Sequence, residues 1–256
     1  MDESPSVVRR AGALLRALAG FEPAGATTTS LAETAGVPRP TAHRLLTALA
    51  AEDLAERDGD TGHWHLGSEC FLLGAAATSR HDVTPLARAT VRRLAAETGE
   101  SAFFSVRRGE ETVCVLREDG SFPIRSHVLH EGIRFPLGVA SAGLAVLALL
   151  PERERESYLA TVDLAVEFGV VHERTSLAER VRVTRERGYA LNPGLIVEGS
   201  WGLGAAVLDG HDVPRWAISL TGIEARIAPR QEQLGQTLLR AAHAISVQVA
   251  SGRGRS

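Results

Sequence analysis

The stretch VPRPTAHRLL, residues 37–46, restricts the fold of this chain more than any other segment. Pro38 and Pro40 have no backbone N–H, so they fit only the residue before a helix and the first helical turn, where N–H groups lack an intrahelical acceptor. The segment therefore predicts a helix that begins at this point. Donor side chains occupy its first turns and leucines follow at helical spacing: Arg39, Thr41, His43 and Arg44, then Leu45, Leu46 and Leu49.

Helical patterns precede this segment and a hairpin pattern follows it. In order, they are an apolar helical period over residues 7–18, a capping box at Ser30 and Glu33 that starts a short helix ended by Gly36, and hairpin strands over residues 54–59 and 63–67. This order predicts a winged helix-turn-helix over residues 1–67. The alternative is a solvated helix start within an α/β domain.

A helix-turn-helix places the first residues of its second helix in the major groove of DNA. Arginine can donate two hydrogen bonds to a guanine edge or a phosphate, while threonine and the helix start suit phosphate oxygens. The hairpin residues are placed to lie along the backbone or minor groove. We therefore expect DNA contacts from Arg39, Pro40, Thr41, His43, Arg44, Arg57 and His63.

Charge shapes the expected mode of DNA binding. All 28 basic residues are arginine, which excludes Schiff-base chemistry and a phosphate-loop lysine. Residues 1–66 hold six arginines and nine acidic residues, a net charge of −3, so a single copy would bind DNA phosphates weakly. We expect a homodimer, or a tetramer built as a dimer of dimers, that pairs recognition helices on double-stranded operator DNA.

A second domain is expected after a linker helix over residues 68–81. Residues 82–256 predict an effector-binding and oligomerisation domain with a largely antiparallel sheet flanked by helices, which makes the fold class α+β. The expected helices begin at Pro85 and end at Gly99, then cover residues 141–150, 152–161, 177–187 (with a capping box at Ser176 and Glu179) and 229–250. The expected strands cover residues 102–108, 112–118, 122–128, 203–209 and 215–222.

The segments LAETAGVPRPTAHRLLTAL, GHWHLG and LAAETGESAFF resemble the IclR family of bacterial transcription regulators. FPLGVASAGLAVLALLP, VRVTRERGYAL and WAISLTG also resemble the family's effector domain in order and spacing. The resemblance extends from about residue 6 to residue 250. It implies a GAF-like effector domain, self-association and control of transcription by a small metabolite, with repression as the first expectation and activation as the alternative.

An acid-binding pocket is expected in the second domain. A loop becomes a helix at Ser141 and Ala142, where small residues let a carboxylate approach free backbone N–H groups. On the strand WAISLTG, Ser219 and Thr221 alternate to one face, opposite the large apolar residues. The family motif implies effector-binding residues at Phe135, Ser141, Ala142, Asn192, Gly202, Ser219 and Thr221.

The chain departs from the family pattern around this pocket. Family members often carry acidic residues after the GYA turn and a lysine at the position of Leu144, whereas here Gly194 and Leu195 are uncharged. Gly202 is expected to widen the cavity beside Trp201. These departures favour a roomier, less polar pocket and an aromatic or longer-chain acid. A degenerate site that binds no effector is the open alternative.

Catalytic and metal sites are disfavoured. VASAG, residues 139–143, lacks the first glycine of the G-x-S-x-G nucleophile elbow, and no histidine and acid follow in a strand pattern. The histidines and cysteines show no metal-ligand spacing. We expect no cofactor, no metal and no enzymatic activity. The competing hypothesis is a metabolite-binding or hydrolytic α/β protein whose winged helix makes protein contacts.

The sequence also predicts the compartment. No apolar run approaches the roughly 20 residues that a membrane span needs, and the first ten residues lack the apolar core of a secretory signal. The cytoplasm is the expected location, without a membrane partner. Cys70 and Cys114 are far apart in the sequence, and we expect both to be reduced, packed thiols.

Overall fold

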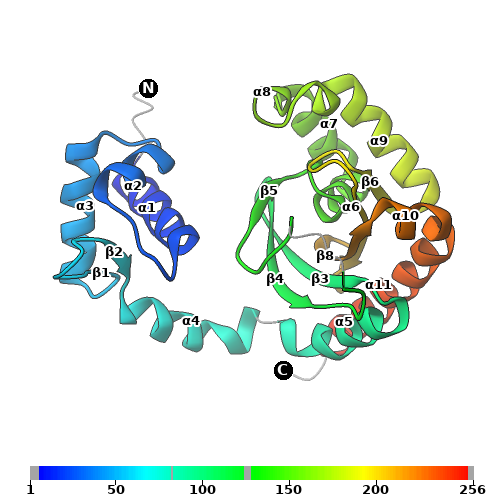
Figure 1. Ribbon diagram of the computed structural model, residues 1–256, viewed down its shortest axis with the longest axis horizontal. Helices are drawn as coiled ribbons and strands as arrows, with labels where there is room; N and C mark the ends of the chain where they lie inside the picture. Colours follow the sequence, from blue (N-terminus) through cyan, green and yellow to red (C-terminus); the bar gives the residue numbers. More distant parts are fainter. Residues whose placement is uncertain (1–5, 82, 124–127, 253–256) are drawn as a thin grey trace. The chain divides into compact units, whose positions relative to one another are not determined.

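The computed structural model describes residues 6–81, 83–123 and 128–252, and it divides into two compact units, Met1–Asp82 and Val83–Ser256 (Figure 1). Each unit has its own hydrophobic core. None of the helices in the described segments combines the length and hydropathy that crossing a lipid bilayer requires.

The N-terminal unit is a winged helix-turn-helix followed by a helix. Its elements are α1 (Val7–Phe21), α2 (Thr28–Thr34), α3 (Arg39–Ala51), β1 (Ala55–Arg57), β2 (Trp64–Leu66) and α4 (Ser68–His81). Strands β1 and β2 pair antiparallel, and Ala26 adds one bridge to Trp64. Leu14, Leu31 and Leu46 are fully buried and hold the three helices together.

The proline prediction is confirmed, because Pro38 is the N-cap of α3 and a second proline lies in its first turn. The prediction that Ser30 caps α2 is wrong. Helix α2 begins at Thr28, two residues before Ser30 and directly after the single bridge between Ala26 and Trp64. The N-cap is Thr27, whose hydroxyl accepts the Ser30 N–H at 3.2 Å.

The C-terminal unit contains a six-stranded antiparallel sheet in the order β5-β4-β3-β8-β7-β6. The strands are β3 (Ser101–Arg108), β4 (Glu111–Glu118), β5 (Arg134–Pro136), β6 (Ala190–Pro193), β7 (Ser200–Leu208) and β8 (Pro214–Ile223). The helices are α5 (Thr84–Thr98), α6 (Ser141–Leu149), α7 (Glu152–Thr161), α8 (Ala165–Phe168), η1 (Val170–His172), α9 (Arg174–Arg187), α10 (Glu224–Ile227), η2 (Ala228–Arg230) and α11 (Gln231–Gly252).

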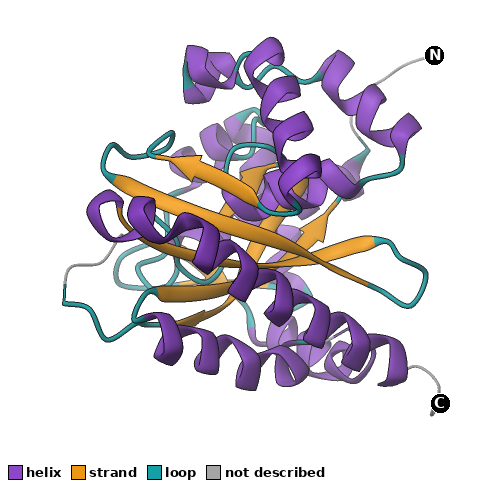
Figure 2. Cartoon of the chain, turned by 90° about the vertical axis from the view of Figure 1, so that its right-hand side faces the viewer, coloured by secondary structure: helices purple, strands orange, loops and turns teal. Residues whose placement is uncertain are grey.

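Helices cover both faces of this sheet (Figure 2). On one face, α5 and α11 enclose a core that includes Phe104 and Ile218. On the other face, α6 packs on β7 and β8, and α9 packs against α6. The alternation expected along β8 is confirmed, because Ile218 belongs to the α5–α11 core whereas Ala217 belongs to the α6 core.

Three local predictions in this unit differ from the structure. Helix α9 begins at Arg174 rather than at residue 177, and Ser176 is not its cap, because Glu173 precedes the helix and accepts the Thr175 hydroxyl at 2.8 Å. Of the strand expected over residues 122–128, the described residues 122, 123 and 128 are not in strand conformation, and the others lie outside the described residues. The edge strands β5 and β6 are absent from the sequence prediction, because three and four residues are too few to give a recognisable strand pattern.

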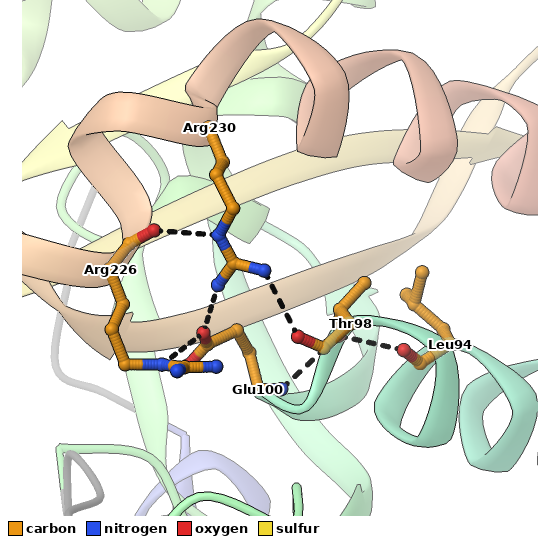
Figure 3. Close-up of polar contacts among 5 residues, drawn as sticks. All are labelled: Leu94, Thr98, Glu100, Arg226 and Arg230. Atoms are coloured by element: carbon orange, nitrogen blue, oxygen red, sulfur yellow. Dashed lines mark hydrogen bonds and ion pairs between the residues drawn. The ribbon is translucent and has the colours of Figure 1, made fainter.

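A buried carboxylate between α5 and β3 binds arginines of α10 and η2 (Figure 3). Glu100 is 2% exposed and receives Arg226 Nε at 2.7 Å and a second hydrogen bond from Arg230. Arg230 also donates to the Thr98 carbonyl at 3.2 Å. These bonds hold the start of β3 beside the end of β8, where Ser101 pairs with Thr221.

Candidate functional site

Helix α3 separates an exposed donor face from a buried apolar face. Arg39, Pro40, His43 and Arg44 are exposed and Thr41 is half-buried, whereas Ala42, Leu46 and Leu49 are buried. Within the described residues, the side chains of His43 and Arg44 make no hydrogen bond or ion pair. Arg39 Nε donates to Thr29 Oγ1 at 3.1 Å, which ties the start of α3 to α2. The other guanidinium nitrogens of Arg39 have no protein partner in the described part.

The wing residues are more constrained than those of α3. Arg57 Nε donates to the Gly62 carbonyl at 3.2 Å, and its guanidinium carbon lies 5.6 Å from the Trp64 ring centroid. His63 is half-buried, with Nδ1 3.2 Å from the Ala24 carbonyl oxygen. Trp64 donates to Thr28 Oγ1 at 3.0 Å, so the wing is anchored to α2. Arg57 and His63, the two predicted wing contacts, therefore each use one hydrogen-bond donor within the protein.

The wing turn carries a negative charge close to those donors. Asp58 Oδ1 accepts the Thr61 N–H at 2.6 Å and the Asp60 N–H at 3.0 Å. The hydrogen bonds from Thr61 lower the pKa of Asp58 below its ordinary value. The wing tip is thus ionised at neutral pH, and its charge opposes DNA phosphates.

The second predicted site lies where α6 begins against β7 and β8. A cavity of about 20 Å³ there is lined by Val128, Leu129, Ala140, Ser141, Asn192, Ile196, Ser200, Gly202 and Thr221. Four predicted residues therefore line it: Ser141, Asn192, Gly202 and Thr221. Leu129, Ile196 and Ser200 were not predicted, because they come from loops and a strand start with no pattern of their own.

Three predicted residues do not line this cavity. Ala142 is buried in the α6 core, and Ser219 is fully buried in β8 opposite Gly204 of β7. Phe135 is half-buried on β5 and packs edge-on against Phe168, with ring centroids 6.4 Å apart. Phe135 therefore packs against Phe168 and does not line the cavity.

The prediction of a roomy pocket is wrong for this conformation. A volume of this size has room for about one water molecule. Gly202 does not create space, because a Cβ there would lie 3.1 Å from Ser141 Oγ, and at Gly204 a Cβ would lie 2.4 Å from the Ser141 carbonyl oxygen. The two glycines instead let the start of α6 rest directly on β7.

Two buried hydroxyls beside this cavity have no hydrogen-bond partner among the described residues: Ser219 Oγ and Thr221 Oγ1. Helix α6 follows Ala140 without a side-chain cap, so its first N–H groups also lack a protein side-chain acceptor. Both kinds of group are suited to a carboxylate, which accepts from hydroxyls and from helix N-termini.

The loop that leads into α6 is held by three side chains from three different elements. Tyr158 OH donates to the Leu137 carbonyl at 2.8 Å, and Arg180 Nη1 donates to the next carbonyl, that of Gly138, at 3.0 Å. Asn192 Nδ2 donates to the Val139 carbonyl at 2.8 Å, while its oxygen accepts the Leu195 N–H. The Asn192 amide, predicted as an effector ligand, is thus committed to positioning this loop.

The structure offers no arrangement for a nucleophile elbow at Ser141. The residues before it form a loop, and the preceding strand β5 runs antiparallel to β4, whereas an elbow requires a strand leading directly into the turn. Burial raises the pKa of Cys114 to about 12, so that thiol is protonated at neutral pH. Among the described residues, no group of three or more metal-ligating side chains comes together.

Comparison with known proteins identifies relatives of both units. The profile of the IclR helix-turn-helix domain matches residues 7–59, and that of the bacterial transcriptional regulator IclR C-terminal domain matches residues 75–247. The chain is 30% identical over 253 residues to the glycerol operon regulatory protein of Streptomyces coelicolor, covering 96% of this chain and 97% of that protein. It is 28% identical over 223 residues to the transcriptional repressor IclR of Escherichia coli, covering 86% and 81%.

A solved structure shows the same fold over most of the chain. The IclR homologue of Microbacterium hydrocarbonoxydans, crystallised with 4-hydroxybenzoate, superposes with a TM-score of 0.75 at 21% identity, covering 96% of this chain and all of that one. The two matching profiles together span most of the sequence in the order of the two structural units. The chain belongs to the IclR family of bacterial transcriptional regulators.

Proposed function

We propose that this regulator is a repressor that binds operator DNA through α3 and releases it when a small carboxylate binds at the start of α6. The DNA contacts come from Arg39, Pro40, Thr41, His43 and Arg44 of α3, with Arg57 and His63 of the wing. The observation that carries this proposal is the exposed donor face of α3, on which His43 and Arg44 make no side-chain hydrogen bond within the described residues, above a leucine core. Repression is favoured because relatives include the transcriptional repressor IclR of Escherichia coli and the acetate operon repressor of Salmonella typhimurium.

The proposed organisation assigns DNA binding to residues 1–67, the linker to residues 68–81, and effector binding and oligomerisation to residues 82–256. The proposed assembly is a homodimer or a dimer of dimers. Helix α4 supports self-association, because Phe71, Leu72 and Leu73 are 76%, 56% and 54% exposed. Three consecutive exposed apolar residues are costly in water and are typical of a surface that a second copy covers.

The proposed effector is a small monocarboxylate. Its oxygens would accept from Ser219, Thr221 and the first N–H groups of α6, with Ser141, Ala142, Asn192, Gly202 and Phe135 forming or supporting the site. The 4-hydroxybenzoate complex of the Microbacterium homologue supports an acid as the chemical class. The cavity of about 20 Å³ has room for only about one water molecule, so binding of the acid requires the side chains and loops that line the cavity to move apart.

Fluorescence anisotropy with the duplex upstream of the chain's own coding sequence tests this function. We expect tight binding to that duplex, weaker binding to a scrambled duplex, and release by one member of a panel of carboxylic acids that also raises the melting temperature. The double variant His43→Ala/Arg44→Ala serves as the binding-deficient control. Equal affinity of wild type and control for both duplexes would contradict the proposal.

A further inference from the structure

Three consecutive threonine hydroxyls at the start of α2 have three different partners. Thr27 caps the helix. Thr28 Oγ1 accepts a hydrogen bond from Trp64 Nε1 of the wing at 3.0 Å. Thr29 Oγ1 accepts one from Arg39 Nε of α3 at 3.1 Å. Because successive helical residues point about 100° apart, these hydroxyls reach in different directions. The start of α2 therefore joins both the wing and α3 within the N-terminal unit.

Arg39 differs from the other long donors of α3 because a side chain of another helix holds it. His43 and Arg44 make no side-chain hydrogen bond within the described residues. Arg39 and Thr29 are both exposed, so the bond between them adds little to the stability of the fold. Its main physical effect is to restrict the rotamers of a long side chain at the start of α3 before DNA is bound.

The bond to Thr29 leaves the outer end of the Arg39 guanidinium available. Nε lies next to the aliphatic stem, whereas Nη1 and Nη2 lie at the tip and have no protein partner in the described segments. Terminal N–H groups held in one plane can donate together to N7 and O6 of a guanine, the commonest specific contact in the major groove. A guanidinium that rotates freely can still reach phosphates, which occur at every step of the duplex. Holding Nε therefore favours contact with a base over contact with the backbone.

We infer that Thr29 is a positioning residue for sequence-specific DNA binding, which holds the Arg39 guanidinium so that Nη1 and Nη2 meet the edge of a guanine in the major groove. This inference rests on the proposed contact of α3 with operator DNA, and it adds a residue of α2 that does not itself bind the duplex. Ordering a side chain of this length on binding reduces affinity by about 2- to 10-fold, and Thr29 removes that loss in advance. Its contribution is to affinity for the correct sequence and not to folding.

Fluorescence anisotropy of the full chain tests this inference, with a duplex that the wild type enriches from a random pool and with a scrambled duplex of the same composition. Thr29→Val removes the hydroxyl and keeps the shape of the side chain. We expect it to weaken binding to the enriched duplex by about 2- to 10-fold, and binding to the scrambled duplex by less than about 2-fold. Thr29→Ser keeps the hydroxyl and should bind both duplexes as the wild type does. Thr34→Val makes the same substitution at the exposed far end of α2 and should also leave both affinities unchanged.

A double-mutant cycle shows whether Thr29 acts through Arg39. Arg39→Ala should weaken binding to the enriched duplex by at least about 5-fold, and adding Thr29→Val to it should weaken binding no further. Losses that add in the double variant would overturn the inference, because they would show that the Thr29 hydroxyl contacts the duplex by itself.

Three other results would also overturn it: wild-type affinity of Thr29→Val or of Arg39→Ala, equal losses of Thr29→Val on the two duplexes, and a melting temperature that falls in Thr29→Val but not in Thr29→Ser, which would show a role in folding. A wild type that enriches no sequence from the pool would instead contradict the proposed function, and with it the inference.

Discussion

The functional polar groups of the two units differ in their exposure to water. The donors of α3, such as His43 and Arg44, are exposed and already hydrated in the free protein. The hydroxyls of Ser219 and Thr221 are buried without partners, and each such group costs about 1–3 kcal/mol of stability. DNA affinity is therefore expected to be strongly salt-dependent, whereas effector binding should recover stability that the free C-terminal unit lacks.

The largest expected effect concerns how two DNA-binding units act together. Phe71→Glu places a charge on the exposed apolar stretch of α4, which should separate the protomers. Loss of bivalent contact should weaken binding to a two-half-site operator by about 100-fold or more. Analytical ultracentrifugation measures the change of oligomeric state, and anisotropy measures the change of affinity. A Phe71→Glu protein that remains a dimer would remove α4 from the interface.

A smaller loss is expected at a single donor of α3. Arg44→Ala should cost about 1–3 kcal/mol of specific DNA binding if this side chain contacts a base. Because Arg44 is exposed and unpartnered, the free energy of unfolding should change by less than about 0.5 kcal/mol. Anisotropy against specific and scrambled duplexes, with chemical denaturation, checks both parts. An equal loss on both duplexes would instead assign Arg44 to a phosphate.

A partnered buried carboxylate in the C-terminal unit provides a contrast with the unpartnered hydroxyls. Burial alone raises the pKa of Asp209, but hydrogen bonds from Arg215, His211 and Val213 outweigh it and lower the pKa to about 2. Its stabilisation is complete above the unfolded value of about 3.9 and is lost as the pH falls toward the folded value.

Asp209→Asn should therefore reduce stability by about 1–2 kcal/mol at neutral pH, with no difference from the wild type at the acid end. Thermal melts between neutral pH and the acid limit test this dependence. A constant difference across that range would show that the ionised form is not the source of the stabilisation.

The smallest expected effect has the opposite sign. Ser219→Ala/Thr221→Val removes the two unpartnered hydroxyls, but the volume lost at position 219 offsets part of that gain, so the free protein should gain a net of about 1 kcal/mol. The same variant should lose its response to the effector acid. Denaturation in the absence of ligand measures the gain. A loss of stability would mean that these hydroxyls are satisfied in the free protein.

Much of the fold follows from local sequence patterns, and the differences have local causes. Pro38 and Pro40 require a helix start whatever the surroundings, so α3 is predictable. The cap of α2 is not, because Ala26 pairs with a residue of the wing that lies far along the chain. Strands β5 and β6 are short edge strands with proline at one end, and such strands need no alternation of apolar residues.

The residues of the effector site likewise differ in whether a local sequence pattern predicts them. The shared face of Ser219 and Thr221 follows from strand alternation alone. The role of Asn192 depends on the Val139 carbonyl, 53 residues away, and no local pattern indicates that bond. The sequence predicts that Gly202 widens the cavity, but whether a missing Cβ leaves a void or admits a neighbour depends on packing, and here Ser141 Oγ lies 3.1 Å from where that Cβ would be.

Hydrogen–deuterium exchange of the full chain, with operator duplex and with effector acid added separately, tests the central claim most directly. We expect DNA to slow exchange in residues 39–51 and the acid to slow exchange in residues 137–143, where the first N–H groups of α6 have no side-chain acceptor. Protection by DNA that avoids α3, or by the acid that avoids the start of α6, would contradict it.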